Sequence, residues 1–101
     1  MFEVRWVSRA RRQAVATQTW WIANREHAPT MFRDELARMI SLLQANPELG
    51  VRVHGREIRR ILIPDTKHLI FYRVRPEEKE IEVVALWSAT RASGPPLPLD
   101  P

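Results

Sequence analysis

The sequence predicts an α+β domain in which an antiparallel sheet is covered on one face by an αα-hairpin. Two observations predict this fold. In His68–Arg75 apolar and aromatic residues occupy both alternating sets of positions, which is typical of a central strand buried on both faces. Upstream, two stretches repeat their apolar residues every three or four positions, which is typical of amphipathic helices. The expected order of elements is β-α-α-β-β-β.

The chain begins with a predicted strand over residues 1–7, where apolar residues alternate with charged ones. A first helix is expected from Arg9 to about Arg25, with Ser8 as its N-cap. The helix stripe that would face the core is narrow and consists mostly of small residues: Ala10, Ala14, Thr17 and Trp21. A strand followed by a helix therefore opens the domain.

A second helix follows after a short connection. Pro29 suits its first turn, because the missing amide hydrogen would have no partner there, and Asn46-Pro47 ends it. Its apolar face has the most regular spacing in the chain, with Phe32, Leu36, Met39, Ile40 and Leu43. The short connection makes the two helices antiparallel neighbours. Residues 51–57 fit either a loop or the end of an extra strand.

Three apolar runs then predict a meander over residues 58–63, 68–75 and 80–87. The segments between them, Pro64–Lys67 and Pro76–Lys79, carry proline early and polar residues after it, as in hairpin turns. Past Arg91 the chain becomes rich in proline. We expect one domain over residues 1–92 and an extended or disordered tail over residues 93–101.

Composition excludes several classes of protein. The 101 residues include no cysteine, which excludes a disulfide scaffold and thiolate metal sites, and three scattered histidines do not form a zinc site. We expect no metal and no cofactor. No apolar run approaches the roughly 20 residues of a membrane span, so we expect a cytoplasmic protein with no membrane partner. The net charge of +4 favours an acidic partner, either nucleic acid or protein, although arginines can also simply solvate a surface.

Several segments together resemble one known family. They are Trp6-Val7-Ser8 followed by Ala10, Ala28, Phe32–Leu43 leading to Asn46–Gly50, Ile58–Ile63, Leu69–Val74 and Ile81–Leu86. Their order and spacing, from Phe2 to Arg91, resemble the RelE/ParE superfamily of bacterial type II toxins and are most similar to its ParE branch. The resemblance implies a toxin that a cognate antitoxin neutralises in a hetero-oligomer. In the ParE branch the implied target is DNA gyrase, and in the RelE branch the implied activity is cleavage of messenger RNA on the ribosome.

The two branches differ in the residues that RNA cleavage requires. The RelE resemblance would put an arginine just before the central apolar triplet and a histidine or tyrosine just after the last strand, where this sequence has Leu69 and Trp87-Ser88. Because neither leucine nor indole can exchange a proton, we expect a non-catalytic inhibitor of gyrase. The alternatives are a ribosome-dependent endoribonuclease with a rearranged set of His54, His68 and Arg73, and a scaffold that only binds its antitoxin.

Arginines are the candidates for binding a target or an antitoxin. Three of them lie at the start of the first helix, where positive charge opposes the helix dipole, and three lie on the meander. We predict a basic patch made of Arg9, Arg11, Arg12, Arg59, Arg60 and Arg73. In the alternative interpretation, these arginines flank the sheet and extend into water.

Overall fold

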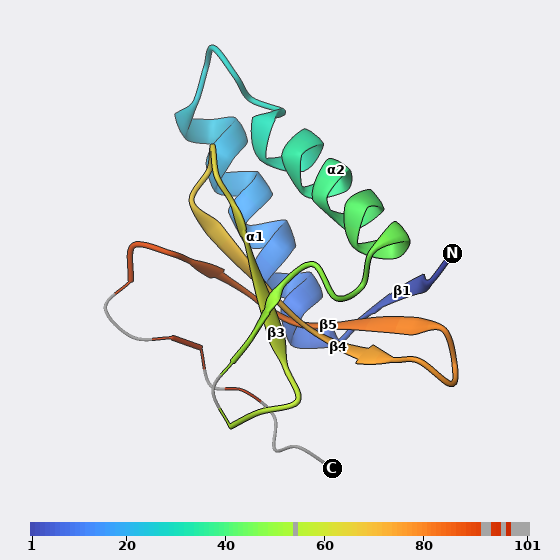
Figure 1. Cartoon of the computed structure of the whole chain (residues 1–101). Helices are drawn as coiled ribbons and strands as arrows, with labels where there is room; N and C mark the ends of the chain where they lie inside the picture. The colour runs from blue at the N-terminus through green and yellow to red at the C-terminus, as the bar shows by residue number, and fades with distance from the viewer. Residues whose placement is uncertain (54, 92–93, 96, 98–101) are drawn as a thin grey trace.

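The computed structural model describes residues 1–53, 55–91, 94, 95 and 97, and it confirms the α+β class (Figure 1). The elements are β1 (Glu3–Trp6), α1 (Ser8–Asn24), α2 (Met31–Ala45), β2 (Val51–Arg52), β3 (Arg59–Ile63), β4 (His68–Arg75) and β5 (Glu80–Ser88). Neither helix is long and apolar enough to cross a membrane, as far as the described residues go. The two helices lie on the same side of one sheet (Figure 1).

The sheet has the strand order β1-β5-β4-β3-β2. The predicted meander is present, since β3, β4 and β5 pair antiparallel, and residues 51–57 contribute the short edge strand β2. The direction of β1 differs from the antiparallel arrangement that we predicted, because β1 pairs with β5 in parallel. An alternating pattern is the same in both directions, so the sequence of β1 does not determine how it runs.

The register between β4 and β5 contains a bulge. Phe71 pairs with Ala85, whereas the next residue of β4, Tyr72, pairs with Val83, so that Val84 is an extra residue in β5. The bulge changes which face the following side chains occupy. Leu86 consequently lies with Val83 on the face that the helices cover, which we call the inner face. Val84 and Ala85 both belong to a cluster on the opposite face, which we call the outer face.

The main core lies between the helices and the inner face. Its buried side chains come from both helices and from β3, β4 and β5: Ala10, Trp21, Phe32, Met39, Leu43, Ile63, Ile70, Tyr72, Ile81, Val83 and Leu86. The predicted helix stripes face this core, with Ala14, Leu36 and Ile40 at its margin. Apolar burial stabilises folding by about 25 cal/mol per Å². This helix-on-sheet contact is therefore the main source of stability.

Helix α1 begins one residue earlier than predicted, whereas α2 begins later than predicted. Val7, not Ser8, occupies the N-cap of α1, because its amide still donates to the carbonyl of Val83 as an extension of β1. Pro29 lies before the N-cap of α2, Thr30, and so is not in the first turn. At α1, the hydrogen bond that extends β1, rather than local capping preference, determines where the helix starts.

The hydroxyl of Tyr72 attaches the segment after α2 to the middle of the sheet. Tyr72 is fully buried, its Oη donates to the carbonyl of Pro47 at 2.8 Å, and it accepts from the amide of Gly50 at 2.8 Å. Burial raises the pKa of the Tyr72 phenol, which therefore stays protonated. A Cβ at Gly50 would lie 2.7 Å from both Tyr72 Oη and the carbonyl oxygen of Arg60, so only glycine fits there.

A smaller apolar cluster covers part of the outer face. Its buried members are Ile58, Phe71, Val84 and Ala85. Leu97, from the predicted tail, packs against this cluster. Residues 93, 96 and 98–101 of that tail lie outside the described residues, so the boundary between domain and tail stays a prediction.

Replacing Tyr72 with Phe should lower the free energy of unfolding by about 1–3 kcal/mol, because the Gly50 amide and the Pro47 carbonyl would lose their partner. Urea denaturation followed by circular dichroism measures the change. Ser41→Ala is the control, since it removes a hydroxyl from an exposed position on α2 and should cost less than about 0.5 kcal/mol. Equal effects of the two substitutions would contradict the role of the Tyr72 hydroxyl.

Candidate functional site on the outer face

The two positions at which the RelE resemblance implies catalytic residues face each other on the outer face. Leu69 of β4 pairs in register with Trp87 of β5, and both side chains pack against the outer cluster. The guanidinium of Arg91 lies 4.2 Å from the centre of the Trp87 ring. The fold brings these two positions together as neighbours, but their side chains form an apolar surface that cannot transfer a proton.

Further along the same strands, the outer face carries a cluster of charges around Glu82. The Glu82 carboxylate is 4% exposed and contacts the guanidinium groups of Arg5, Arg73 and Arg75. Arg73 Nη2 lies 2.9 Å from Glu82 Oε1, and Arg75 Nη2 lies 3.3 Å from the same oxygen. The predicted site residue Arg73 is therefore held by a buried carboxylate.

The pKa of Glu82 follows from these contacts. Burial acts to raise the pKa, because the charged carboxylate is poorly solvated inside the protein. The hydrogen bonds and positive charges of Arg73 and Arg75 act in the opposite direction and together outweigh burial, so the pKa of Glu82 lies below its usual value. The carboxylate stays ionised at neutral pH and keeps the arginines around it.

His68 lies on the other side of the sheet from Arg73. Its ring packs edge-on against Phe32 of α2 at 5.3 Å between ring centres, and its Nδ1 lies 2.9 Å from the carbonyl oxygen of Thr66. A carbonyl can only accept, so Nδ1 carries the hydrogen in this bond. Burial lowers the pKa of His68 more than this bond raises it. The structure does not bring His68 and Arg73 together, and His54 lies outside the described residues.

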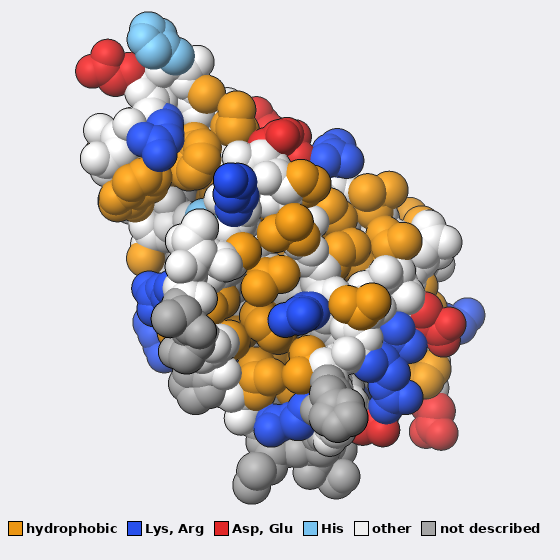
Figure 2. Space-filling view, turned by 60° about the vertical axis from the view of Figure 1, so that its left-hand side comes forward, with side chains coloured by type: hydrophobic (Ala, Val, Ile, Leu, Met, Phe, Trp, Pro, Cys, Tyr) orange, Lys and Arg blue, Asp and Glu red, His pale blue; other side chains and the backbone are white. Residues whose placement is uncertain are grey.

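The six arginines of the predicted basic patch differ in their surroundings. Arg9 Nη2 donates to the carbonyl of Val84 at 3.3 Å, and Arg59 Nη1 donates to the carbonyl of Gly50 at 2.8 Å. Arg11, Arg12 and Arg60 are exposed and form no ion pair in the part of the chain that the structure describes. In Figure 2, lysine and arginine side chains stand among apolar ones over much of the visible face, while acidic side chains lie towards its margins. On this face the cations are dispersed.

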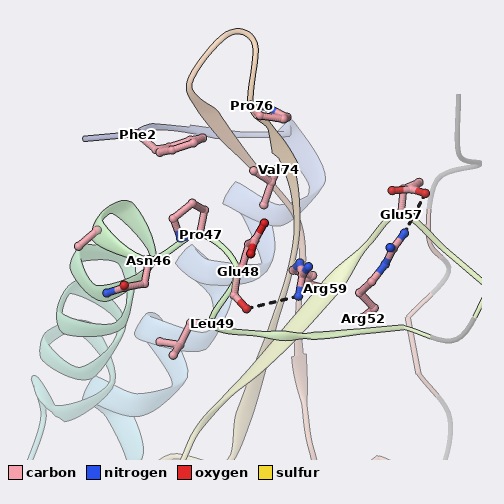
Figure 3. Close-up of a pocket in the computed structure, with 11 residues that line it drawn as sticks. Phe2, Asn46, Pro47, Glu48, Leu49, Arg52, Glu57, Arg59, Val74 and Pro76 are labelled. Atoms are coloured by element: carbon pink, nitrogen blue, oxygen red, sulfur yellow. Dashed lines mark hydrogen bonds and ion pairs between the residues drawn. The ribbon is translucent and has the colours of Figure 1, made fainter.

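A groove of about 630 Å³ lies beside Arg59, between the N-terminal segment, the end of α2 and the edge of the sheet (Figure 3). Its apolar wall is formed by Phe2, Pro47, Leu49, Val74 and Pro76. Among its charged groups, Arg52 pairs with Glu57 at 2.8 Å and Arg59 donates to the carbonyl oxygen of Glu48 at 3.3 Å. Two arginines and two glutamates line this groove, so its lining has no net positive charge to attract an acidic ligand.

Sequence reasoning missed the Glu82 cluster, although a signal was present. Arg73 and Arg75 alternate in β4 as Glu80 and Glu82 do in β5, which places them on one face of neighbouring strands. The residues that form the groove beside Arg59 come from distant segments of the chain, and no local sequence pattern identifies them. Among the described residues, no group of three or more histidine, aspartate or glutamate side chains could hold a metal ion.

A family model described as the ParE toxin of the type II toxin-antitoxin system parDE matches residues 4–92. The fold is similar to a chain of the intact E. coli RelBE toxin–antitoxin complex (TM-score 0.68, 13% identity, 90% of this chain and 100% of that chain covered). It is also similar to the isolated E. coli RelE toxin (0.66, 14%, 91% and 88%) and to a chain of a chromosomal ParDE system from P. aeruginosa (0.63, 15%, 87% and 96%). No curated protein sequence matches significantly.

Replacing Glu82 with Gln should lower the free energy of unfolding at pH 7 by roughly 1–3 kcal/mol, because three guanidinium groups would lose their buried counter-charge. The pKa of Glu82 is lower in the folded chain than its usual 4.5, so the carboxylate stabilises the fold above that pH. This contribution is lost as the pH falls through the folded-state pKa. The difference between the wild type and Glu82→Gln should therefore shrink in acid.

Urea denaturation at a series of pH values measures this difference. Glu78→Gln is the control, because Glu78 is exposed in the turn between β4 and β5 and forms no ion pair among the described residues. A difference between wild type and Glu82→Gln that stayed constant from neutral to acidic pH would exclude the proposed linkage.

Proposed function

Because the chain belongs to the ParE toxin family of type II toxin–antitoxin systems, we propose that it is a non-catalytic toxin that inhibits DNA gyrase in the cytoplasm and that a cognate antitoxin neutralises it. The observation that carries this proposal is the pairing of Leu69 with Trp87 on the outer face. The positions that the RelE resemblance assigns to catalysis hold Leu69 and Trp87-Ser88, in place of an arginine and of a histidine or tyrosine. The proposed toxin thus acts by binding its target and does not cleave RNA.

Cleavage of RNA by attack of a 2′-hydroxyl needs a base, an acid and cations where charge develops on the phosphate. The rearranged set that we considered does not supply them together. His68 packs under α2 on the inner face, while Arg73 is bound to Glu82 on the outer face. A phosphate at Arg73 would have to displace a buried carboxylate that three arginines contact, which disfavours phosphate binding there.

An antitoxin partner is supported by the relatives and by the exposed arginines. The similar chains in the RelBE and ParDE structures come from toxin–antitoxin systems. In this chain, Arg11 and Arg12 project from the first turns of α1, which contains no acidic residue in its first turn. They are available to an acidic segment, and we propose that the toxin and antitoxin form a hetero-oligomer in this way.

A second candidate function is a ribosome-dependent endoribonuclease, because the fold is also similar to that of E. coli RelE. The fold is similar to structures from both the RelE and the ParE branch, so fold similarity alone does not choose between the two functions. The two functions differ in what they change in a cell: a gyrase inhibitor leaves transcripts intact, whereas an endoribonuclease cuts them while the DNA stays intact.

The purified chain should block supercoiling of relaxed plasmid by gyrase, because we expect it to bind the enzyme directly. Primer extension on translated messages should show no new ends, and His68→Ala should leave both results unchanged. Cut messages together with unaffected supercoiling would replace this proposal with the endoribonuclease. Absence of both effects, with antitoxin binding retained, would indicate a scaffold that only binds its antitoxin.

Reversing two charges, with Arg11→Glu and Arg12→Glu, should weaken binding of the antitoxin or the target about tenfold at low salt. Arg9 is kept because it donates to the carbonyl of Val84. Stability should not fall, since glutamate at the start of a helix is favoured by the helix dipole by roughly 0.3–1 kcal/mol per residue.

Titration calorimetry with each partner and thermal unfolding measure the two effects. Arg33→Glu with Arg38→Glu makes the same change in net charge on the exposed side of α2 and should weaken binding less. Unchanged affinity of the Arg11 and Arg12 variant for both partners would remove this end of α1 from the interface.

A further inference from the structure

A second groove, of about 830 Å³, lies where the C-terminal half of α1 meets the turn between β3 and β4 and the segment after β5. It shares Arg91 with the outer-face site and contains no residue of the predicted basic patch. We call it the α1 groove, and the residues that define it are Trp20, Arg25, Met31, Lys67 and Arg91. Three separate segments thus contribute a cation to one hollow.

The cations of the α1 groove have no acidic partner. Arg25, Lys67 and Arg91 are all exposed, and none of them forms an ion pair within the described ranges. Asp65 is the one acidic residue among those that line the groove there. The groove therefore carries a net positive charge, whereas the groove beside Arg59 is lined by two arginines and two glutamates.

The wall of the α1 groove is aromatic and incompletely covered. Trp20 is 48% exposed and Met31 is 36% exposed. The guanidinium of Arg25 lies 4.9 Å from the centre of the Trp20 ring, which holds a cation directly beside an accessible apolar surface. Thr66, at the same wall, has a buried hydroxyl with no hydrogen-bond partner in the described structure.

We propose that the α1 groove binds an acidic peptide segment of the antitoxin, with an apolar side chain seated against Trp20 and carboxylates beside Arg25, Lys67 and Arg91. Charge complementarity selects an acidic segment, and the exposed indole selects an apolar anchor within it. Only the identity of the partner rests on the proposed function. The groove itself would hold a segment of this chemistry whether or not the toxin acts on gyrase.

Fluorescence anisotropy of the full chain with a labelled synthetic peptide, in which leucine and phenylalanine alternate with glutamate, tests the groove. Arg25→Glu with Lys67→Glu should weaken binding about tenfold. Trp20→Ser should weaken it without any change in charge. The matched control is Arg52→Glu with Lys79→Glu, which makes the same change in net charge at two exposed positions outside the groove and should leave peptide binding within about twofold. Circular dichroism checks that each variant is folded.

The proposal is overturned if the peptide does not bind, or if both double variants weaken it equally, because the attraction would then be general. Binding of a labelled oligothymidylate at the groove in place of the peptide would also overturn it in favour of a nucleic acid. An antitoxin that binds the chain without displacing the peptide would exclude the antitoxin as the occupant. Failure of the gyrase assay would overturn the proposed function and leave these results unaffected.

Discussion

The constraint on which the whole structure depends is that β4 is apolar on both faces. Ile70 and Tyr72 require cover on the inner face, and the two helices provide it, while Phe71 requires cover on the outer face. An outer face with buried apolar side chains cannot also present solvated catalytic groups at the same positions. Leu69 and Trp87 accordingly pack against the outer cluster, at positions where the RelE resemblance implies catalytic residues. The non-catalytic toxin that we propose agrees with this constraint.

The distribution of charge separates arginines that hold the fold from arginines that are available to a partner. Arg5, Arg73 and Arg75 surround Glu82 and form ion pairs with its carboxylate, which partly neutralises their charge. Among the described residues, three exposed arginines that form no ion pair lie at the two ends of α1, with Arg11 and Arg12 at one end and Arg25 at the other. A helix of 17 residues is about 25 Å long, so one partner that contacted both ends would have to extend along the whole helix.

The sequence predicted most of the fold and little of the site, for physical reasons. The helices and the meander follow from apolar spacing, which burial enforces along their whole length, as at Phe32, Met39 and Leu43. The direction of β1 and the extra residue Val84 depend on pairing with distant strands, which no local pattern records. For the site, the pairing of Leu69 with Trp87 follows from a meander, but the α1 groove exists only because three distant segments meet.

The parallel pairing of β1 with β5 has a consequence for how the protein is made. Arg5 and its partner Glu82 are 77 positions apart, so the first strand to leave the ribosome is completed by the last one. Closing such a distant contact is slow, because the chain loses much entropy before any ladder bond forms. A nascent chain that still lacks β5 has an unfinished sheet and an uncovered helix hairpin. The mature surface therefore arises only after β5 has been made, so a binding partner gains access to it from that moment on.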